Sequence, residues 1–548
     1  MSFSSTTRQR MLDSLDTEVY DLLIIGGGIT GVGIALDAAT RGLKTVLVEK
    51  NDFAYGTSSR STKLIHGGLR YLKQFEFALV KEVGSERAIV HNIAPHLVLA
   101  EKMLLPLSEG RGLGVFLTSF GLKLYDWLAG VKLADQRRML TRKKTLRTEP
   151  LLRKEGIKGG GLYAEYRTDD ARLTIELAKT AVKNGAHLLS YTKALSFVYE
   201  SEKVIGAQVE DVFSGKTHTI KAKAIINATG PWVDELRELD KSRRGKTLHL
   251  TKGVHIVVPQ RKFPIGQAIY FDVSDGRMIF AIPRGKTTYI GTTDTDYKAT
   301  LDDVSVSEAD AVYLLEAVKE TFPTIQLTLS DIESSWAGLR PLIHEEGKSA
   351  SELSRKDEIF ESPSGLISIA GGKLTGYRKM AERVVSLVGR KYFNQRNLKP
   401  CTTHKIKVTG GDFKNSKEVR AYLLAVKKRM QLVKQEEYLT RYLVHTYGKQ
   451  TDAILNGVNV RMEQGMAAEE ALLLAELSFG WEHEMVLTPQ DFVNRRTSMM
   501  LFDVSRLTKF KVLILDSFQK HFQWSQQLLE EERMKLDEEI YRSNHFTT

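Results

Sequence analysis

The residues best placed to do chemistry near the start of the chain form a glycine-rich turn. Its six residues fit the pattern G-x-G-x-x-G: Gly26, Gly27, Gly28, Ile29, Thr30 and Gly31. They follow an apolar segment at 20–25 and begin a helical pattern that ends near residue 41, before a second apolar segment at 44–48. In such a strand–turn–helix unit the glycines allow a tight turn, close approach of a pyrophosphate, and close packing of the helix on the strand. The motif therefore predicts a dinucleotide site with the phosphates at the helix N-terminus.

A carboxylate and a second strand end extend this site. Glu49 follows the second apolar segment, 23 residues after Gly26, where a carboxylate can accept hydrogen bonds from both hydroxyls of a ribose. A later apolar strand, 224–227, ends in three small residues that would let it pass close to a bound FAD: Ala228, Thr229 and Gly230. The glycine motif alone does not separate NAD from FAD, and this second strand end favours FAD.

The elements that must position these residues are of two kinds. A helical pattern at 170–184 and strand patterns at 187–191, 204–212, 217–227 and 366–370 continue the α/β alternation, and a helical pattern follows Gly371 and Gly372 as far as residue 388. Residues 247–297 instead show short alternating strands with a turn at 274–276, which is typical of an antiparallel sheet. Residues after 411 are helix-forming. We expect an α/β protein with a Rossmann-like FAD-binding domain, an antiparallel β-rich substrate domain and a helical C-terminal domain.

Several strings of residues, in chain order, resemble the FAD-dependent glycerol-3-phosphate dehydrogenases. The most specific string is 57–71, TSSRSTKLIHGGLRY, and the others are 226–234, 252–255, 291–294, 338–342 and 371–375. The resemblance is strong over about residues 20–400 and looser beyond them. It implies the fold of the D-amino-acid-oxidase-like flavoproteins, with further FAD contacts from these two strings: Thr57, Ser58 and Ser59, and Gly372, Leu374 and Thr375.

The same resemblance implies a division of the chain and a reaction. The expected FAD-binding domain is split over 1–95, 160–245 and 345–400, the substrate-binding domain comprises 96–159 and 246–344, and the helical domain is 401–548. Members of the family oxidise sn-glycerol 3-phosphate to dihydroxyacetone phosphate and pass the electrons to a membrane quinone. Relatives that use oxygen are typically longer, so the length of this chain favours the dehydrogenase. The alternatives are an FAD-dependent glycerol-phosphate oxidase that uses oxygen and an oxidase of amino or hydroxy acids on the same fold.

A phosphate ester with nearly two negative charges needs fixed cations in its site. Arg70, Arg340 and Lys373 are the candidates, because each lies among glycines or prolines where a loop can hold a side chain toward a cleft. The same three cations would also suit a carboxylate, which leaves the amino-acid alternative open. Tyr71 and His66, within the most specific string, complete the expected substrate site.

Oxidation of an alcohol by flavin requires a hydride on C2 to reach flavin N5 while a base accepts the hydroxyl proton. His255 and His66 are suitable, because an unperturbed imidazole titrates near pH ~6.5. We predict His255 as the base, and His66 as either a second candidate or a loop histidine packed beside FAD. Arg340, with a pKa above ~12, suits polarisation of the developing alkoxide. A helix beginning within 372–375 would stabilise negative charge on the reduced flavin, and Lys373 is expected to act in catalysis as well as in binding.

Composition limits the remaining functions. The net charge is +12, yet the basic residues are scattered apart from a group at 137–147, so we expect no nucleic-acid partner. Cys401 is the only cysteine, and no metal site is expected.

The first residues carry no apolar targeting segment, which predicts a cytoplasmic protein. Residues 113–147 combine an apolar stretch with the basic group, and they predict either peripheral membrane contact or a core helix with a solvated basic loop.

Overall fold

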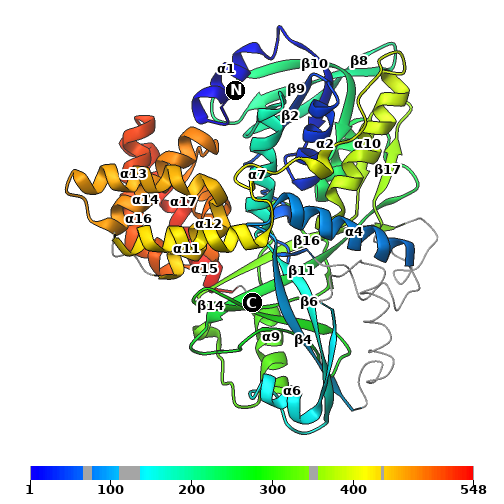
Figure 1. The fold of residues 1–548 in the computed structure, drawn as a ribbon. Helices are drawn as coiled ribbons and strands as arrows, with labels where there is room; N and C mark the ends of the chain where they lie inside the picture. Colours follow the sequence, from blue (N-terminus) through cyan, green and yellow to red (C-terminus); the bar gives the residue numbers. More distant parts are fainter. Residues whose placement is uncertain (1, 66–76, 110–135, 345–355, 433–436, 547–548) are drawn as a thin grey trace.

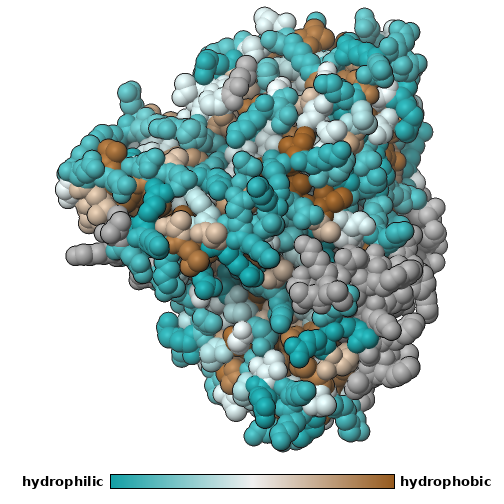
Figure 2. Space-filling view, viewed as in Figure 1, coloured by the Kyte–Doolittle hydropathy of each residue, from teal (hydrophilic) through white to brown (hydrophobic). Residues whose placement is uncertain are grey.

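The chain folds around two β-sheets and a group of C-terminal helices, in a computed structural model of all 548 residues. The structure describes residues 2–65, 77–109, 136–344, 356–432 and 437–546. Figure 1 shows sheet A in the upper part of the molecule, sheet B in the lower part, and the C-terminal helices as a lobe beside both. The face shown in Figure 2 is mostly hydrophilic, with apolar residues in small separate groups.

Sheet A contains the predicted dinucleotide-binding unit. Its strands are β1 (Val19–Ile25), β2 (Thr45–Val48), β7 (His187–Leu189), β8 (Thr192–Glu200), β9 (Lys203–Asp211), β10 (Thr217–Asn227), β17 (Glu358–Glu361) and β18 (Ile367–Ala370). β1 lies between β2 and β10, and all three run parallel. The helix α2 (Ile29–Thr40) packs against both α7 (Asp170–Lys183) and α10 (Tyr377–Tyr392) beside this sheet. Because helices cover it, β2 is buried along its whole length, which explains its continuous apolar run.

Sheet B is mostly antiparallel, as the alternating pattern of 247–297 predicted. Its strands are β3 (Leu64–Ile65), β4 (Leu99–Ser108), β5 (Arg138–Thr141), β6 (Ile157–Arg167), β11 (Thr247–Pro259), β12 (Ala268–Asp272), β13 (Met278–Arg284), β14 (Thr287–Gly291), β15 (Thr295–Asp296) and β16 (Ser334–His344). The predicted turn at 274–276 joins β12 to β13 as an antiparallel pair. β6 pairs with β4, and β3 pairs with β6, so both strands belong to sheet B. The division expected from the sequence places β3 and residues 160–167 of β6 in the FAD-binding domain.

Two local predictions were wrong. The short strands expected from residue 247 onward begin with one long strand, β11, because β16 and β14 supply hydrogen-bond partners along its length. The helix expected to begin within 372–375 begins at Tyr377, after a 3-10 turn at Leu374–Gly376. Gly371 and Gly372 both have positive φ, at 75° and 77°, and this left-handed backbone cannot continue into a right-handed helix.

The remaining helices surround the sheets or form the C-terminal lobe. Those before residue 400 are α1 (Ser5–Ser14), α4 (Phe77–Ile93), α6 (Arg142–Thr148), α8 (Val233–Leu239) and α9 (Glu308–Thr321). The C-terminal lobe contains α11 (Ser416–Leu432), α12 (Glu437–Tyr447), α13 (Thr451–Glu463), α14 (Ala468–His483), a π-helical turn η9 (Asp491–Arg496), α15 (Met499–Phe502), α16 (Val504–Phe522) and α17 (Gln526–Asn544). The structure thus has the predicted α/β class with a helical C-terminal region.

A buried ionic cluster joins the C-terminal lobe to α7. Arg172 donates to Glu484 and Glu176, and Lys179 donates to Glu484 at 3.0 Å. All of these side chains are at most 4% exposed. Burial alone would raise the pKa of Glu484, but Arg172 and Lys179 outweigh burial and lower it to about 2. The charges are therefore stable in the core only as a group.

We predict that Glu484→Ala lowers the free energy of unfolding by about 3–5 kcal/mol, because it leaves Arg172 and Lys179 buried without their carboxylate. Thermal and urea unfolding of the full chain would measure the loss. Glu482→Ala is the matched control, since the side chain of Glu482 is 69% exposed, and its effect should stay within about 0.5 kcal/mol. Equal effects of the two substitutions would contradict the prediction.

Candidate active site

The glycine turn forms a cradle at the end of β1. A Cβ at Gly26 would lie 2.5 Å from the carbonyl oxygen of Ala228, and one at Gly31 would collide with the carbonyl oxygen of Gly26. Gly26 also has a φ of 115°, which a side chain would strain. Gly28 is the N-cap residue of α2, and both Gly28 and Thr30 are only half-buried. The helix N-terminus is therefore accessible to an anion, which its free N–H groups and dipole favour.

Glu49 is held against this turn. Its carboxylate accepts the backbone N–H of Gly27 at 2.6 Å and that of Asn51 at 2.9 Å. A Cβ at Gly27 would lie 2.8 Å from the Cβ of Glu49, so this glycine is required for the approach. Burial raises the pKa of Glu49. Two backbone donors occupy only part of the hydrogen-bonding capacity of a carboxylate, and the rest is available to ribose hydroxyls.

The other predicted cofactor residues follow strands of the same sheet. The register pairs Ile25 with both Asn227 and Val48, and Asn227 with Ser368, so the carboxyl ends of four parallel strands are aligned. The residues that follow these ends are Gly26 to Gly31, Glu49, Ala228 to Gly230 and Gly371 to Thr375. The carboxyl edge of a parallel sheet is where such folds bind ligands. Tertiary structure thus brings four distant predicted segments to one edge.

The segment Thr57–Lys63 connects this edge to sheet B. Ser58 Oγ accepts the N–H of Ile29 at 2.9 Å, at the first turn of α2. On the other side, Thr57 Oγ1 donates to the carbonyl of Leu339 at 2.8 Å, and Trp336 Nε1 donates to the carbonyl of Ser61 at 3.1 Å. Ser59 is half-buried in the same turn. This segment therefore contacts both the glycine turn and β16.

His255 lies in β11 with its ring fixed on three sides. The ring stacks on Trp336 with centroids 4.6 Å apart, and Nε2 forms a 3.0 Å hydrogen bond with Thr62 Oγ1. A Cβ at Gly291 would collide with the ring, so the glycine of β14 is needed for this packing. The Nδ1 atom is buried and has no hydrogen-bond partner. Burial, followed by the charges of Arg340 and Lys63, holds the pKa of His255 well below 6.5, which keeps the imidazole neutral.

Arg340 lies on the same face of sheet B as His255. In the register of β11 and β16, Thr251 pairs with Arg340, and His255 pairs with Trp336 four residues further along each strand. Because side chains alternate between the two faces of a strand, residues separated by an even number of positions lie on the same face. Gly253, between them, has no side chain, and a Cβ there would collide with the guanidinium of Arg340. The guanidinium is therefore directed along the face toward His255, whose pKa it lowers.

The residues that follow β14, 292–294, hold Arg340 in place. The guanidinium donates to Thr292 Oγ1 at 2.9 Å, to the carbonyl of Thr293 at 3.1 Å and to Asp294 at 3.2 Å. The side chain of Arg340 is 31% exposed, so part of it faces solvent. A cation with a fixed orientation and an accessible edge suits an anionic ligand.

The other predicted substrate residues are placed only in part. Lys373 is half-buried at the carboxyl edge of sheet A, and it precedes the 3-10 turn in which Leu374 is half-buried and Thr375 buried. His66, Arg70 and Tyr71 lie outside the described residues, so their contacts stay predictions.

The structure adds residues that the sequence reasoning missed. Thr62 and Trp336 contact His255, and Lys63 donates to Asp170 at 2.6 Å. Trp336 lies two and four residues before Gly338 and Arg340, so period-two alternation in β16 would have placed it on their face. Thr62 and Lys63 belong to the specific string at 57–71, but their partners are distant in sequence and no local pattern indicates them.

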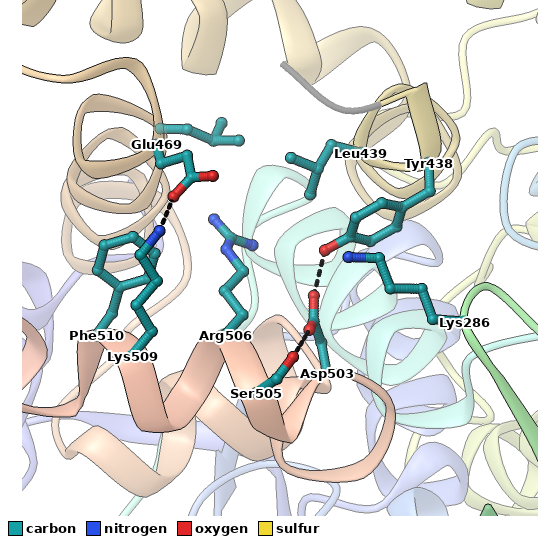
Figure 3. Close-up of a pocket in the computed structure, with 10 residues that line it drawn as sticks. Lys286, Tyr438, Leu439, Glu469, Asp503, Ser505, Arg506, Lys509 and Phe510 are labelled. Carbon is teal, nitrogen blue, oxygen red and sulfur yellow. Dashed lines mark hydrogen bonds and ion pairs between the residues drawn. The ribbon is translucent and has the colours of Figure 1, made fainter. Parts of the chain in front are cut away.

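A separate pocket lies between the C-terminal lobe and sheet B. Figure 3 shows the side chains of Lys286, from the turn between β13 and β14, and Tyr438 next to each other. The ammonium nitrogen of Lys286 lies 4.0 Å from the centroid of the ring. Tyr438 donates to Asp503, and Lys509 pairs with Glu469. Of the predicted flavin and substrate residues that the structure describes, none lines this pocket. The candidate active site is therefore the region between the carboxyl edge of sheet A and the His255 face of sheet B.

Comparison with known proteins agrees with this arrangement. The profile of the family "FAD dependent oxidoreductase" matches residues 21–378, and that of "C-terminal domain of alpha-glycerophosphate oxidase" matches residues 401–528. The aerobic glycerol-3-phosphate dehydrogenase of Bacillus subtilis (strain 168) is 51% identical over 528 residues, which cover 96% of this chain and 95% of that protein. The enzyme of the same name from Staphylococcus aureus (strain USA300) is 46% identical, with 100% and 98% covered. The X-ray structure of glycerol-3-phosphate dehydrogenase from Bacillus halodurans complexed with FAD matches with a TM-score of 0.84, 44% identity and 99% of each chain covered.

The lowered pKa of His255 predicts a pH dependence of stability. Below about pH 6.5 the unfolded chain binds a proton at this residue that the folded chain does not, so stability is full above that pH and falls as the pH drops. The slope from one such group is up to about 1.4 kcal/mol per pH unit. Urea unfolding of wild type and His255→Asn at several pH values between about 5 and 7.5 should show a shallower fall for the variant. Parallel curves would show that protonation of His255 does not oppose folding.

Proposed function

Because the chain belongs to the family of FAD-dependent oxidoreductases that includes the aerobic glycerol-3-phosphate dehydrogenases, we propose that it oxidises sn-glycerol 3-phosphate to dihydroxyacetone phosphate. The observation that carries this proposal is the pairing of a buried, neutral His255 with the fixed cation Arg340 on one face, beside the loop that contacts the glycine turn. A neutral base and a fixed cation are what oxidation of an anionic alcohol requires.

The residues at the carboxyl edge of sheet A fit FAD. Gly26 to Gly31 would hold the pyrophosphate, Glu49 the ribose, and Ala228 to Gly230 would pass beside the cofactor. The glycine turn supports this placement of FAD, because Cβ atoms at Gly26 and Gly31 would collide with neighbouring backbone carbonyl groups. FAD bound there supplies the acceptor for the hydride on C2 of the substrate, at flavin N5. Thr57, Ser58, Ser59, Gly372, Leu374 and Thr375 are proposed as further contacts to the cofactor.

His255 is the proposed general base. Its unpartnered Nδ1 is an atom at which a proton from the C2 hydroxyl could be held. Burial, and after it the nearby charge of Arg340, lowers the pKa of His255 in the structure. A dianionic ester bound at Arg340 would offset that charge and so raise the pKa. Arg340 would meanwhile polarise the developing alkoxide, and Lys373 is the second cation proposed to act in catalysis.

The phosphate of the substrate is assigned to the predicted cations. Arg70, Arg340 and Lys373 are proposed to bind it, together with Tyr71 and His66. Arg340 and Lys373 come from different sheets, so a phosphate bound by both would bridge sheet B and the carboxyl edge of sheet A. This bridging would fix the ester relative to the cofactor.

A membrane quinone is the proposed electron acceptor, with oxygen as the alternative. Quinone is lipid-soluble, so the protein would contact the inner face of the cell membrane from the cytoplasm. The basic residues of β5 and α6 support such contact, because these five are exposed: Arg138, Arg142, Lys143, Lys144 and Arg147. Of the proposed membrane segment 113–147, residues 113–135 lie outside the described residues. Among the helices that the structure describes, none has the length and apolar character to span a bilayer.

The substrate can be tested by anaerobic titration of the purified flavoprotein. We predict that glycerol 3-phosphate bleaches the visible absorbance of the bound flavin, whereas glycine and sarcosine do not, because neither amino acid carries the doubly charged phosphate and the C2 hydroxyl on which the proposed site acts. His255→Asn should slow the bleaching by about 10²–10⁴-fold, the usual contribution of a general base. A wild-type flavoprotein that stays oxidised with glycerol 3-phosphate but is bleached by an amino acid would replace this substrate assignment with the amino-acid oxidase alternative.

Membrane contact can be tested by sedimentation with vesicles that contain anionic lipid. Wild type should co-sediment, and the variant Arg137→Glu, Arg138→Glu, Lys143→Glu and Lys144→Glu should not, because attraction of basic side chains to anionic lipid is worth about 1 kcal/mol each. The control reverses four exposed basic residues elsewhere, Lys414, Lys417, Arg420 and Lys428. It changes the net charge equally and should still bind. Undiminished binding of the first variant would remove residues 137–144 from the membrane proposal.

A further inference from the structure

Asp52 is a buried carboxylate that the proposed chemistry does not use. It is 0% exposed and lies three residues after Glu49. Two consecutive arginines of the C-terminal lobe donate to it: Arg495 Nε at 2.5 Å, and Arg496 Nη1 and Nη2 at 2.7 and 2.8 Å. Both arginine side chains are at most 8% exposed. A carboxylate in this position would be costly to bury without both partners.

A π-helical turn of the C-terminal lobe places both arginines on the carboxylate of Asp52. Adjacent residues of an α-helix project about 100° apart, but Arg495 and Arg496 end a π-helical turn, Asp491–Arg496. Such turns are rare and concentrate at functional sites. Arg495 also donates to Asp491 at 2.9 Å, and Arg496 donates to the carbonyl of Glu484 at 2.9 and 3.1 Å. The two guanidinium groups are therefore oriented before they meet Asp52.

Asp52 is connected to the glycine turn through its chain neighbours. Asn51 N–H donates to Glu49 Oε1 at 2.9 Å, and Gly27 N–H donates to Glu49 Oε2 at 2.6 Å. Ala54 N–H, two residues after Asp52, donates to the carbonyl of Gly27 at 3.0 Å. Residues on both sides of Asp52 thus bond to the turn or to Glu49. Displacement of Asp52 would move the proposed ribose carboxylate and the turn together.

The contact extends to the loop that joins the sheets. The Arg495 guanidinium lies 5.7 Å from the ring centroid of Tyr55, and that of Arg60 lies 5.2 Å from the same ring. Tyr55 N–H donates to the carbonyl of Asp52 at 3.2 Å. The two arginines of the C-terminal lobe therefore contact the segment between Glu49 and the turn at 57–59 at Asp52 and at Tyr55.

We propose that Arg495 and Arg496 are positioning residues for the flavin: the π-helical turn of the C-terminal lobe fixes Asp52, and through it the orientation of Glu49 toward the ribose. This inference rests on the proposed placement of FAD at the glycine turn. It gives the C-terminal lobe a role in cofactor binding, although none of its residues belongs to the Rossmann-like unit. Loss of an orienting partner around a binding site commonly weakens binding by about 10–100-fold, as known for metal sites.

The test compares Arg495→Gln with Arg506→Gln in the full-length holoenzyme. Arg506, which is labelled in Figure 3, is a matched control. It also donates from the C-terminal lobe to a buried carboxylate, Glu476 at 2.8 Å, and its side chain is 10% exposed. Dilution of each holoenzyme, followed by recovery of flavin fluorescence, gives the dissociation constant for FAD. Arg495→Gln should weaken FAD binding by at least about tenfold, and Arg506→Gln should leave it within about twofold of wild type. Thermal unfolding of both proteins without FAD measures the general loss of stability.

Additional readouts separate positioning from a structural role. With a dye as electron acceptor, excess FAD should restore kcat of Arg495→Gln with an unchanged KM for glycerol 3-phosphate. Arg495→Lys keeps the positive charge but loses the planar guanidinium with its fixed donors, so its FAD affinity should be intermediate. It provides the comparison if the Gln variant does not fold. Unchanged FAD affinity in Arg495→Gln and Arg495→Lys, or equal weakening in Arg506→Gln, would overturn the inference. Failure of the wild-type chain to bind FAD would instead overturn the placement of the cofactor.

Discussion

The buried ion pair between Lys63 and Asp170 is the interaction on which the candidate site depends. Lys63 Nζ donates to Asp170 at 2.6 Å and to the carbonyl of Ser59 at 2.9 Å, and both charged side chains are at most 1% exposed. Asp170 also accepts the N–H and hydroxyl of Ser61. Lys63 adopts a left-handed φ of 57°, which is uncommon for a residue with a side chain. The ion pair offsets this strain and fixes the segment between Thr57 and Lys63.

That segment determines how the two sheets face each other. On one side Ser58 contacts the first turn of α2, and on the other Thr62 contacts His255. The cofactor edge and the predicted base are therefore related by the short half-buried segment 58–62, which contacts both α2 and β11. Asp169, which precedes Asp170, bonds to Arg284 of sheet B and to Ser498 of the C-terminal lobe. The N-terminus of α7 is thus the point at which all three parts of the chain meet.

The C-terminal lobe completes this arrangement from outside. Phe502 packs at 5.9 Å against Trp336, the ring on which His255 stacks, and Ser334 donates to the carbonyl of Leu501 at 2.6 Å. Arg495 and Arg496 reach Asp52 beside the glycine turn. The lobe therefore contacts the flanks of both halves of the candidate site. A helical region with no motif of its own can affect binding and catalysis in this way, through buried contacts that orient other residues.

Local sequence determined the parts of this protein that depend on local physics. The glycine turn, the carboxylate at Glu49, the helix α7 and the hairpin between β12 and β13 follow from backbone freedom and hydrophobic period, and the structure has them where the patterns placed them. The predicted start of α10 was too early. Two glycines with left-handed backbone and then a 3-10 turn precede the helix, and the hydrophobic period of the sequence does not reveal them. The long strand β11 was missed because its length is set by partner strands that pair with it across at least 28 positions of the chain.

Only the tertiary structure decided which residues surround the predicted ones. The sequence singled out His255 and Arg340, but their common face depends on the register of β11 with β16, and the absence of side chains at Gly253 and Gly291 makes room for them. Two ion pairs also depend on the tertiary structure. Asp170 is 107 positions from Lys63 in the chain, and Arg495 is 443 positions from Asp52. Desolvation of charges requires partners, whatever their distance along the chain, so these pairs are fixed by burial in the folded protein and leave no periodic signal in the sequence.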